Sequence, residues 1–400
     1  MPDIEFREAR PEDTDELLEV RNQIFPPVSK EKWFASKCTA AVAFRDGKMV
    51  GAIPLDIREF QVRPGVIMTA AFENAVGVLE QFRGQGLGTG MLDAAKKFLL
   101  GKADVLMVYR GAELSTGYNF YAKNLHYDIT YPRPLALEGE CRLTGDTSAE
   151  IMDISDALRR QEEMNAVFQS VYGGMGGFPP RRPGYWTHAL DQAIFEVLPT
   201  TFKFIRTEEN GRLTGYIIFG HRSVRDKKSI AILEIATRNG DQHIARQLLL
   251  AFRRYVDQYD VPKTASKQEQ SPYYQVLLDT GFIPIPREKT SMMLMAYPLD
   301  PAAMAGKVWG ENAELDKVEV IAWSPLRQVT LHEARGKARK TIRLEMKDDT
   351  LTRLLLSRVD LVKAVEEERV TALGATPADI AAIAKSLPFT QWEYHQIEYL

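Results

Sequence analysis

The residues with the clearest chemical meaning lie in a glycine-rich turn. Gly84, Gly86 and Gly88 follow Arg83 at alternate positions, within the segment 76–100. Apolar residues before the turn predict a buried strand, and apolar positions three and four apart after it predict an amphipathic helix. The first N–H groups of a helix lack internal partners and carry partial positive charge, and glycines let the backbone approach a ligand closely. The turn therefore predicts a phosphate site, to which the guanidinium of Arg83 would add a full charge.

Two other phosphate-binding motifs do not fit this turn. It is not a Walker loop, because no Gly-Lys-Ser/Thr follows it. It is a poor dinucleotide fingerprint, since the third glycine comes one residue early and no ribose-binding acid is clear. From the glycines alone, a βα turn with a purely structural role is the alternative.

The strand, turn and helix together resemble the acetyl-CoA loop of the GNAT N-acetyltransferases. In that family, Gln/Arg-x-x-Gly-x-Gly/Ala follows a Val-x-Val strand. Val76–Val78 match the strand, and Arg83, Gly86 and Gly88 match the loop. The segment Leu114–Lys123 resembles the second signature of the family, a helix that carries Phe-Tyr-x-Lys.

The chain departs from the second signature just after this helix. Leu125 and His126 stand where a glycine and an aromatic residue are usual, and Tyr127 restores an aromatic residue one step later. The backbone conformation after Asn124 is therefore left open, whereas Tyr121 keeps its place in the signature.

The preceding chain supplies the expected framework of this unit. Ile4–Arg7 predicts a short strand, Pro11–Ile24 a helix, and residues 39–53 a β-hairpin. Val66–Leu79 predicts a long strand that leads to the turn, and Val105–Tyr109 its parallel neighbour. In the GNAT fold these two strands diverge, and the pantetheine arm of the cofactor lies between them.

Residues 139–300 predict a second α/β unit that repeats the order of strands and helices. The turn that matches the glycine-rich loop, 238–243, lacks Gly-x-Gly, and the carboxylate of Asp241 would repel a phosphate. We interpret this half as a degenerate GNAT copy without a cofactor, with an unrelated α/β domain as the alternative. Residues 172–184, rich in Gly and Pro, predict an extended loop that either flanks the acceptor site or lies on the surface.

The last hundred residues have a different pattern. Val318–Ala322 and Lys340–Met346 predict strands, and short amphipathic helices follow from residue 350. This order resembles the sterol-carrier-protein-like fold, which can hold a lipid. The chain ends with an aromatic tail, 392–400, and its composition favours docking over disorder.

Composition narrows the classes of function. The formal net charge of −3 gives no electrostatic argument for nucleic acid or an anionic membrane. The two cysteines, Cys38 and Cys141, form no disulfide framework, which fits a reducing cytosol. No apolar signal segment or membrane-spanning run is found, and the six scattered histidines predict no metal site. We therefore expect a cytoplasmic protein without metal, nucleic-acid partner or membrane insertion.

Two GNAT units and a sterol-carrier-like domain in 400 residues resemble the Eis (enhanced intracellular survival) family of acetyltransferases. The resemblance implies an α/β (α+β) fold of tandem GNAT units with mixed sheets flanked by helices, and a small α/β C-terminal domain. The implied parts are an acetyl-CoA-binding catalytic unit (1–138), a degenerate unit (139–300) and the C-terminal domain with its tail (301–400). Family members acetylate amines of aminoglycosides and other polyamines and assemble as hexamers, so a homo-oligomer is expected, with an aminoglycoside, polyamine or lysine-like primary amine as acceptor.

Carried over by position, the resemblance also assigns the cofactor contacts. Backbone N–H groups would hold the thioester end of acetyl-CoA at Val76, Gly77 and Val78. The pyrophosphate would lie against the loop residues Arg83, Gly84, Gln85, Gly86, Leu87, Gly88 and Thr89. The pantetheine arm would contact Thr116 and Gly117.

The resemblance assigns the chemistry to two further residues. Tyr121 would be the general acid, and the carboxylate of the last residue, here Leu400, would be the base, although the family usually ends in Phe. Glu73, on the strand before the turn, is the other candidate for the base. A binding module for acyl-CoA or lipid that performs no chemistry is the competing class, and the intact Tyr121 argues against it because a pure binder needs no acid there.

Overall fold

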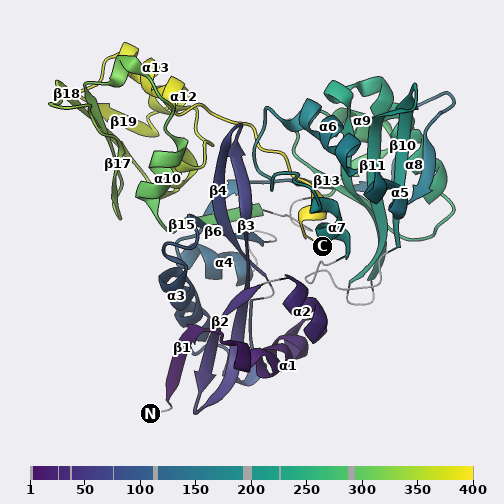
Figure 1. Ribbon diagram of the computed structural model, residues 1–400, viewed down its shortest axis with the longest axis horizontal. Helices are drawn as coiled ribbons and strands as arrows, with labels where there is room; N and C mark the ends of the chain where they lie inside the picture. Colours follow the sequence, from purple (N-terminus) through teal and green to yellow (C-terminus); the bar gives the residue numbers. More distant parts are fainter. Residues whose placement is uncertain are drawn as a thin grey trace.

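The computed structural model describes residues 3–25, 27–36, 38–74, 76–110, 116–191, 201–224, 227–286 and 293–399. Within these ranges the chain forms three mixed sheets flanked by helices (Figure 1). Two larger sheets form the cores of the two α/β units, and a smaller one belongs to the C-terminal domain. The end of the chain lies in the middle of the molecule, between the units (Figure 1).

The first sheet has the order β1-β2-β3-β4-β6-β15-β7, and β5 pairs with β3. Alternate residues of β2 face opposite layers, because Ala41 and Ala43 pack with α3 whereas Ala40 and Val42 pack with α1 and α2. The elements are β1 (Ile4–Glu8), α1 (Thr14–Ile24), α2 (Lys30–Ser36), β2 (Thr39–Arg45), β3 (Lys48–Arg63), β4 (Val66–Glu73), β5 (Gly77–Val78), α3 (Leu87–Leu99), β6 (Val105–Arg110), α4 (Thr116–Lys123), β7 (Tyr127–Thr130) and β15 (Met293–Pro298).

The second sheet has the order β14-β8-β13-β12-β11-β10-β9. Within this sheet, β10 and β11 form a hairpin, β11 pairs with β12, and the helix α8 follows β12 in the chain. The elements are β8 (Arg133–Leu137), β9 (Glu150–Asp153), α5 (Ile154–Arg159), α6 (Gln161–Tyr172), α7 (Tyr185–Asp191), β10 (Thr201–Glu209), β11 (Arg212–Val224), β12 (Lys227–Thr237), α8 (Gln242–Val256), β13 (Lys263–Lys267), α9 (Tyr274–Asp279) and β14 (Phe282–Pro284).

The two units exchange one strand each. β8 follows β7 in sequence but lies in the second sheet, between β13 and β14, with Leu135 opposite Ala265. β15 follows β14 in sequence but lies in the first sheet, between β6 and β7, with Met295 opposite Val108. A division of the chain at residues 138 and 300 therefore separates each exchanged strand from the sheet that it completes.

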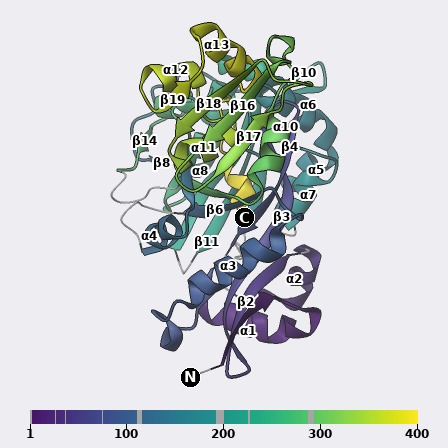
Figure 2. The same ribbon diagram turned by 90° about the vertical axis from the view of Figure 1, so that its left-hand side faces the viewer.

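The C-terminal domain shares a core with the first unit. Its sheet has the order β17-β16-β18-β19, and its apolar residues join one continuous cluster with Met68, Ala70 and Phe72 of β4. Figure 2, turned by 90°, shows this domain stacked above α3. The predicted strands and helices of this part are confirmed. The elements are α10 (Pro301–Val308), β16 (Val318–Trp323), β17 (Gln328–His332), β18 (Lys340–Met346), α11 (Asp348–Leu355), α12 (Leu361–Glu366), β19 (Val370–Leu373) and α13 (Pro377–Ser386).

The expectation of one strand over Val66–Leu79 is wrong at its end. β4 stops at Glu73, which lies opposite Leu55, whereas Gly77 lies opposite Ala52. The four steps from Glu73 to Gly77 therefore correspond to three on β3, so the register shifts by one residue between β4 and β5.

The Gly- and Pro-rich segment 172–184 is only partly a surface loop, because Gly174 and residues 182–184 are exposed whereas residues 176–179 are buried. Gly176 pairs with Trp392 of the tail, and Phe178, which is buried, pairs with Gln61 of β3. A Cβ at Gly176 would lie 2.2 Å from the carbonyl oxygen of Val62, so only glycine fits between the tail and β3. The buried part of the segment is therefore a joint between the units and the tail.

Candidate active site

The glycine-rich turn opens α3 without a capping side chain. Gly84 and Gly86 have φ angles of 77° and 79°, in the left-handed region that favours glycine. Gly86 is the N-cap residue, and no side chain accepts a hydrogen bond from the first N–H groups of the helix. A Cβ at either glycine would meet no atom within 4 Å. The turn therefore presents free N–H groups to open space, which is the geometry of an anion site.

The matching helix of the second unit, α8, is closed at the same point. The carboxylate of Asp241 accepts hydrogen bonds from the backbone N–H groups of His243 and Ile244, at 2.8 and 3.1 Å. A carboxylate cap satisfies the donors that a phosphate would need and adds a negative charge beside them. Of the two equivalent helices, only α3 is prepared for an anionic cofactor.

Two arginines lie beside the open turn. Arg83 is exposed, and its Nε donates to the carbonyl of Val78 at 3.1 Å, so the side chain lies along the turn. Arg45, from the hairpin between β2 and β3, donates to Gln85 Oε1 at 2.6 Å and stacks on the ring of Phe82. Arg45 was not among the residues predicted from sequence, because it lies 40 positions before Gln85. Both cations would favour a pyrophosphate here.

The helix of Tyr121 packs against the start of α3. A Cβ at Gly88 would lie 3.0 Å from the ring of Phe120, so the glycine allows α4 to approach closely. Tyr121 is buried and shares a core with Leu87, Val76 and Val78. The structure thus brings the predicted strand, turn and helix residues together.

The remaining predicted cofactor residues lie at the start of α4. Thr116 is its first residue and Gly117 follows, and both belong to the same short helix as Tyr121. Thr89, exposed on the first turn of α3, lies 3.5 Å from Asn124 at the other end of α4. Residues 111–115, which precede α4, lie outside the described residues.

The two strands beside the turn diverge as the GNAT resemblance implies. β4 and β6 pair in parallel only from Ala70 opposite Val105 to Phe72 opposite Met107. Beyond this point β6 continues to Arg110 without pairing to β4. The β4–β6 ladder therefore ends close to β5 and the turn, where the resemblance places the pantetheine arm.

Glu73 is engaged in a buried pair rather than exposed. Its Oε1 lies 2.7 Å from His126 Nε2, and both side chains have no exposed surface. The ring of His126 also packs edge-on against Tyr121, with 5.2 Å between ring centroids. His126, which stands where the family usually has an aromatic residue, thus contacts both Glu73 and Tyr121. Sequence reasoning identified Glu73 and Tyr121 but not this link, because 53 residues separate the pair.

The tail reaches the same end of the first sheet from the opposite face. The ring of Tyr394 packs on Tyr109 of β6, which stacks on Phe72 of β4, and Arg58 lies over the Phe72 ring. Phe72 and Glu73 are adjacent on a strand, so they face opposite sides of the sheet. The tail therefore covers one side of the point where β4 and β6 diverge, while Tyr121 and Glu73 lie on the other. Leu400 itself lies outside the described residues.

A buried ion network holds the tail in place. Glu398 Oε1 lies 2.6 Å from Arg181 Nη1, and the other terminal nitrogen of Arg181 pairs with Glu234 of β12. The backbone carbonyl of Glu398 accepts from Arg58 Nη2 at 3.3 Å. Arg58 of the first unit and Arg181 of the segment 172–184 thus both contact Glu398, and Arg181 also links the tail to Glu234 of the second unit.

Burial and neighbouring charges shift the pKa values of the ionisable groups around the tail in different directions. Burial raises the pKa of Glu398, while Arg181 and Arg58 oppose the rise. Burial alone would lower the pKa of Arg181, but Glu234 and Glu398 raise it above its usual value. The pKa of His395 lies well below its usual value, because of burial and because Lys267 and Arg181 are close. His395 is therefore neutral, and its 3.8 Å approach to Glu234 is not an ion pair.

The first unit has the fold of the GNAT acetyltransferases. Residues 5–127 match the model of the acetyltransferase (GNAT) family. This match includes the turn, α3, the divergent strands and α4. No helix of the described ranges is long and apolar enough to cross a bilayer. No match was found among curated proteins.

Solved structures share the architecture over nearly the whole chain. A probable N-acyltransferase from Enterococcus faecalis has a TM-score of 0.69 at 13% identity, with 99% of both chains covered. A GCN5-related N-acetyltransferase from Anabaena variabilis has a TM-score of 0.66 at 14% identity, with 98% of this chain and 99% of that one covered. Eis1 from Mycobacterium abscessus has a TM-score of 0.56 at 14% identity, with 98% and 99% covered. At such identities the likeness establishes the shared fold, including its tandem arrangement.

Proposed function

We propose that the protein transfers the acetyl group of acetyl-CoA to a primary amine, with one cofactor site in the first unit. The observation that carries this proposal is the uncapped, glycine-rich start of α3 beside the helix of Tyr121, in contrast to the capped α8. The cofactor-binding residues are those of the turn, Arg83–Thr89, with Val76–Val78 and the start of α4. A homo-oligomer, a hexamer by resemblance, is part of the same proposal.

The reaction needs one acid and one base. The amine nitrogen attacks the thioester carbonyl, the N–C bond forms, the C–S bond breaks, and the sulfur leaves with the electron pair. A thiol of pKa about 8.5 is a fair leaving group, and a phenol, whose reference pKa is about 10, can protonate it. Tyr121 is the residue that we propose for this role. An alkylamine of pKa about 10.4 is almost wholly protonated at neutral pH, so a base must take its proton.

We propose the terminal carboxylate of Leu400 as the base, chiefly on the family resemblance, with Glu73 as the other candidate. Glu73 already pairs with His126 and is buried on the side of α3 and α4. The tail docks through Glu398, two positions before the end of the chain, close to the point where β4 and β6 diverge.

The acceptor that we propose is a basic amine of an aminoglycoside, a polyamine or a lysine-like group. Support comes from the likeness to Eis1 in fold and from the carboxylate base, which suits a cationic nucleophile. The second candidate function, a non-catalytic acyl-CoA or lipid-binding module, is favoured only by the presence of the C-terminal domain. The likeness of that domain to sterol carriers stays a prediction.

Release of free thiol from acetyl-CoA, measured against a panel of an aminoglycoside, spermidine and a lysine peptide, tests the proposal. We expect turnover with at least one amine, and a kcat about 10²-fold lower for Tyr121→Phe with nearly unchanged acetyl-CoA affinity. Tyr127→Phe, on the neighbouring strand β7, is the matched control and should retain turnover. Cofactor binding without thiol release for every amine would favour the binding module, and full turnover in Tyr121→Phe would reduce this residue to a packing role.

A further inference from the structure

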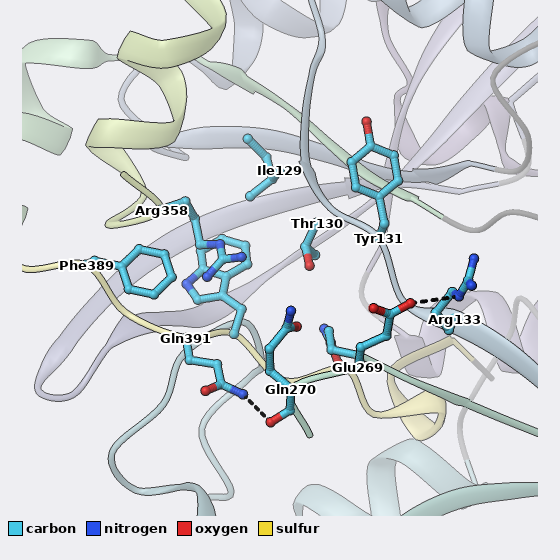
Figure 3. Close-up of a pocket in the computed structure, with 11 residues that line it drawn as sticks. Ile129, Thr130, Tyr131, Arg133, Glu269, Gln270, Arg358, Phe389 and Gln391 are labelled. Atoms are coloured by element: carbon cyan, nitrogen blue, oxygen red, sulfur yellow. Dashed lines mark hydrogen bonds and ion pairs between the residues drawn. The ribbon is translucent and has the colours of Figure 1, made fainter. Parts of the chain in front are cut away.

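A cavity of about 350 Å³ lies away from the glycine-rich turn, where the first unit, the second unit and the tail meet (Figure 3). Its walls come from the link between β7 and β8, from the loop after β13, and from the segment that leads into the tail. Its volume is at the lower end of the range for small-molecule sites. The cavity is polar, and its charged groups are Arg133, Glu269 and Arg358.

Three buried donors at this cavity have no hydrogen-bond acceptor among the described residues: Nε of Arg133, Nε of Arg358 and Nε2 of Gln268. The first of them still forms an ion pair with Glu269 at 3.1 Å, whereas the other two have no such partner in the described part of the chain. The other end of the Gln268 amide is used, because its Oε1 accepts from the backbone N–H of Tyr394 at 2.8 Å. This bond fixes the orientation of the amide, so Nε2 remains as the donor. Buried donors without acceptors are rare, since each loses its hydrogen bond to water.

Arg358 also lacks a carboxylate. Within the described ranges it forms no ion pair, and its Nη1 donates to the backbone carbonyl of Thr390 at 2.6 Å. Its guanidinium stacks beside the rings of Phe389 and Trp392, at 5.1 and 5.7 Å from their centroids. Among the described residues that line the cavity, Glu269 is the acid, and it is already paired with Arg133 at 3.1 Å, as Figure 3 shows.

The charge balance of the cavity is therefore positive. Burial lowers the pKa of Arg358 to about 10, and the neighbouring Arg353 lowers it in the same direction. An anion in the cavity would supply the missing acceptor and the missing charge together. The aromatic rings beside Arg358 would add an apolar surface for a carbon skeleton.

We propose that this cavity binds a small organic oxyanion, with Arg358 and Gln268 as its hydrogen-bond donors. The site accepts the carboxylate or phosphate group of a metabolite-sized molecule, whose apolar part lies against Phe389. Bound ligand links the body of the protein to the segment 389–392, directly before the tail that docks at Glu398. The site is separate from the glycine-rich turn and does not depend on the acetyl transfer proposed above.

Isothermal calorimetry with benzoate and with phenyl phosphate tests this site and distinguishes the two oxyanions. Both titrations use the full-length protein saturated with CoA, so that the turn at α3 is not available to the probe. We expect saturable binding of at least one probe, and a higher midpoint of thermal unfolding in its presence. Inorganic phosphate is the third probe and should bind more weakly, because it lacks the ring.

The decisive variant is Gln268→Glu. Its carboxylate keeps an acceptor for the N–H of Tyr394 but replaces the free donor with a negative charge, so binding should weaken by about tenfold or more. Arg358→Gln should lose binding as well, and Arg343→Gln, which alters an arginine stacked on Trp323 in the sheet of the C-terminal domain, is the control that should retain it. Absence of saturable binding for all three probes, or equal affinity in Gln268→Glu, would overturn the proposal.

Discussion

At the scale of single residues, Leu125 keeps a backbone conformation that its side chain disfavours. The resemblance expects a glycine at this position, and Leu125 has a φ of 65°, in the left-handed region. A non-glycine residue in that region costs about 1–2 kcal/mol. We therefore expect Leu125→Gly to raise the free energy of unfolding by about 1 kcal/mol, net of the greater flexibility of glycine in the unfolded chain.

Urea unfolding measures this effect. Leu100→Gly is the matched control, because Leu100 is exposed and has an ordinary φ of −55°. The control should be neutral or destabilising. A loss of stability in Leu125→Gly as large as in the control would contradict the assignment of strain to this residue.

His395 should make the stability of the tail depend on pH. Its pKa in the folded protein lies well below its ordinary value of about 6.5. As pH falls below about 6.5, the unfolded chain takes up a proton at this residue and the folded protein does not, so stability is lost. The loss approaches about 1.4 kcal/mol per pH unit.

Unfolding between pH 7 and pH 5 tests this sign. The raised pKa of Glu398 acts in the opposite direction, because the folded protein then binds its proton more readily. A comparison with His395→Phe cancels that contribution, since Glu398 is present in both proteins. We expect a shallower loss of stability on acidification in the variant, and parallel curves would exclude His395 as the cause.

Some residues of the candidate site could be predicted from the sequence, whereas the residue pairs that hold the site together could not. The turn, α3 and Tyr121 were predictable because each depends on neighbours within one strand–turn–helix segment. The contacts Glu73–His126 and Arg58–Glu398 could not be predicted, because 53 and 340 residues separate the two members of each pair. No local pattern distinguishes such buried charges from solvated ones until the fold brings them together.

At the scale of elements, α3 and α8 form a natural comparison of an open and a closed helix start. Gly86→Val should abolish CoA binding, because a valine is strained at a φ of 79° and its side chain would enter the open space of the turn. Gly240→Val carries the same substitution at a φ of 73° beside α8 and should retain CoA binding, although it should lose stability. Calorimetry should find one CoA per chain, and two equivalent sites would disprove the reading of α8.

The order of elements was largely predictable, and the pairing of two of them was not. Hairpins and helices follow from hydrophobic period and turn residues, which act locally. The exchange of β8 and β15 depends on which open sheet edge accepts a strand, and both strands are apolar enough to fit either sheet. The end of β4 at Glu73 was also missed, although the polar residues Glu73 and Asn74 interrupt the apolar pattern there.

At the scale of the whole molecule, the tail connects all parts and should control turnover. Removal of Tyr399 and Leu400 should lower kcat strongly and leave CoA binding intact, because the turn at α3 lies in the first unit alone. The variant Glu73→Gln, which removes the other candidate base, is compared with the truncated enzyme. Thiol-release kinetics decide between the two bases, since an active truncated enzyme with an inactive Glu73→Gln would identify Glu73 as the base.

The exchanged strands also bear on how the chain folds during synthesis. The first sheet cannot close until residues 293–298 have left the ribosome, because β15 separates β6 from β7. At roughly 5–20 residues per second, the incomplete edge of β6 stays open for on the order of ten seconds or more. An open strand edge is a template for pairing with another chain. The nascent first unit is therefore a natural client for a chaperone that shields strand edges until the second unit emerges.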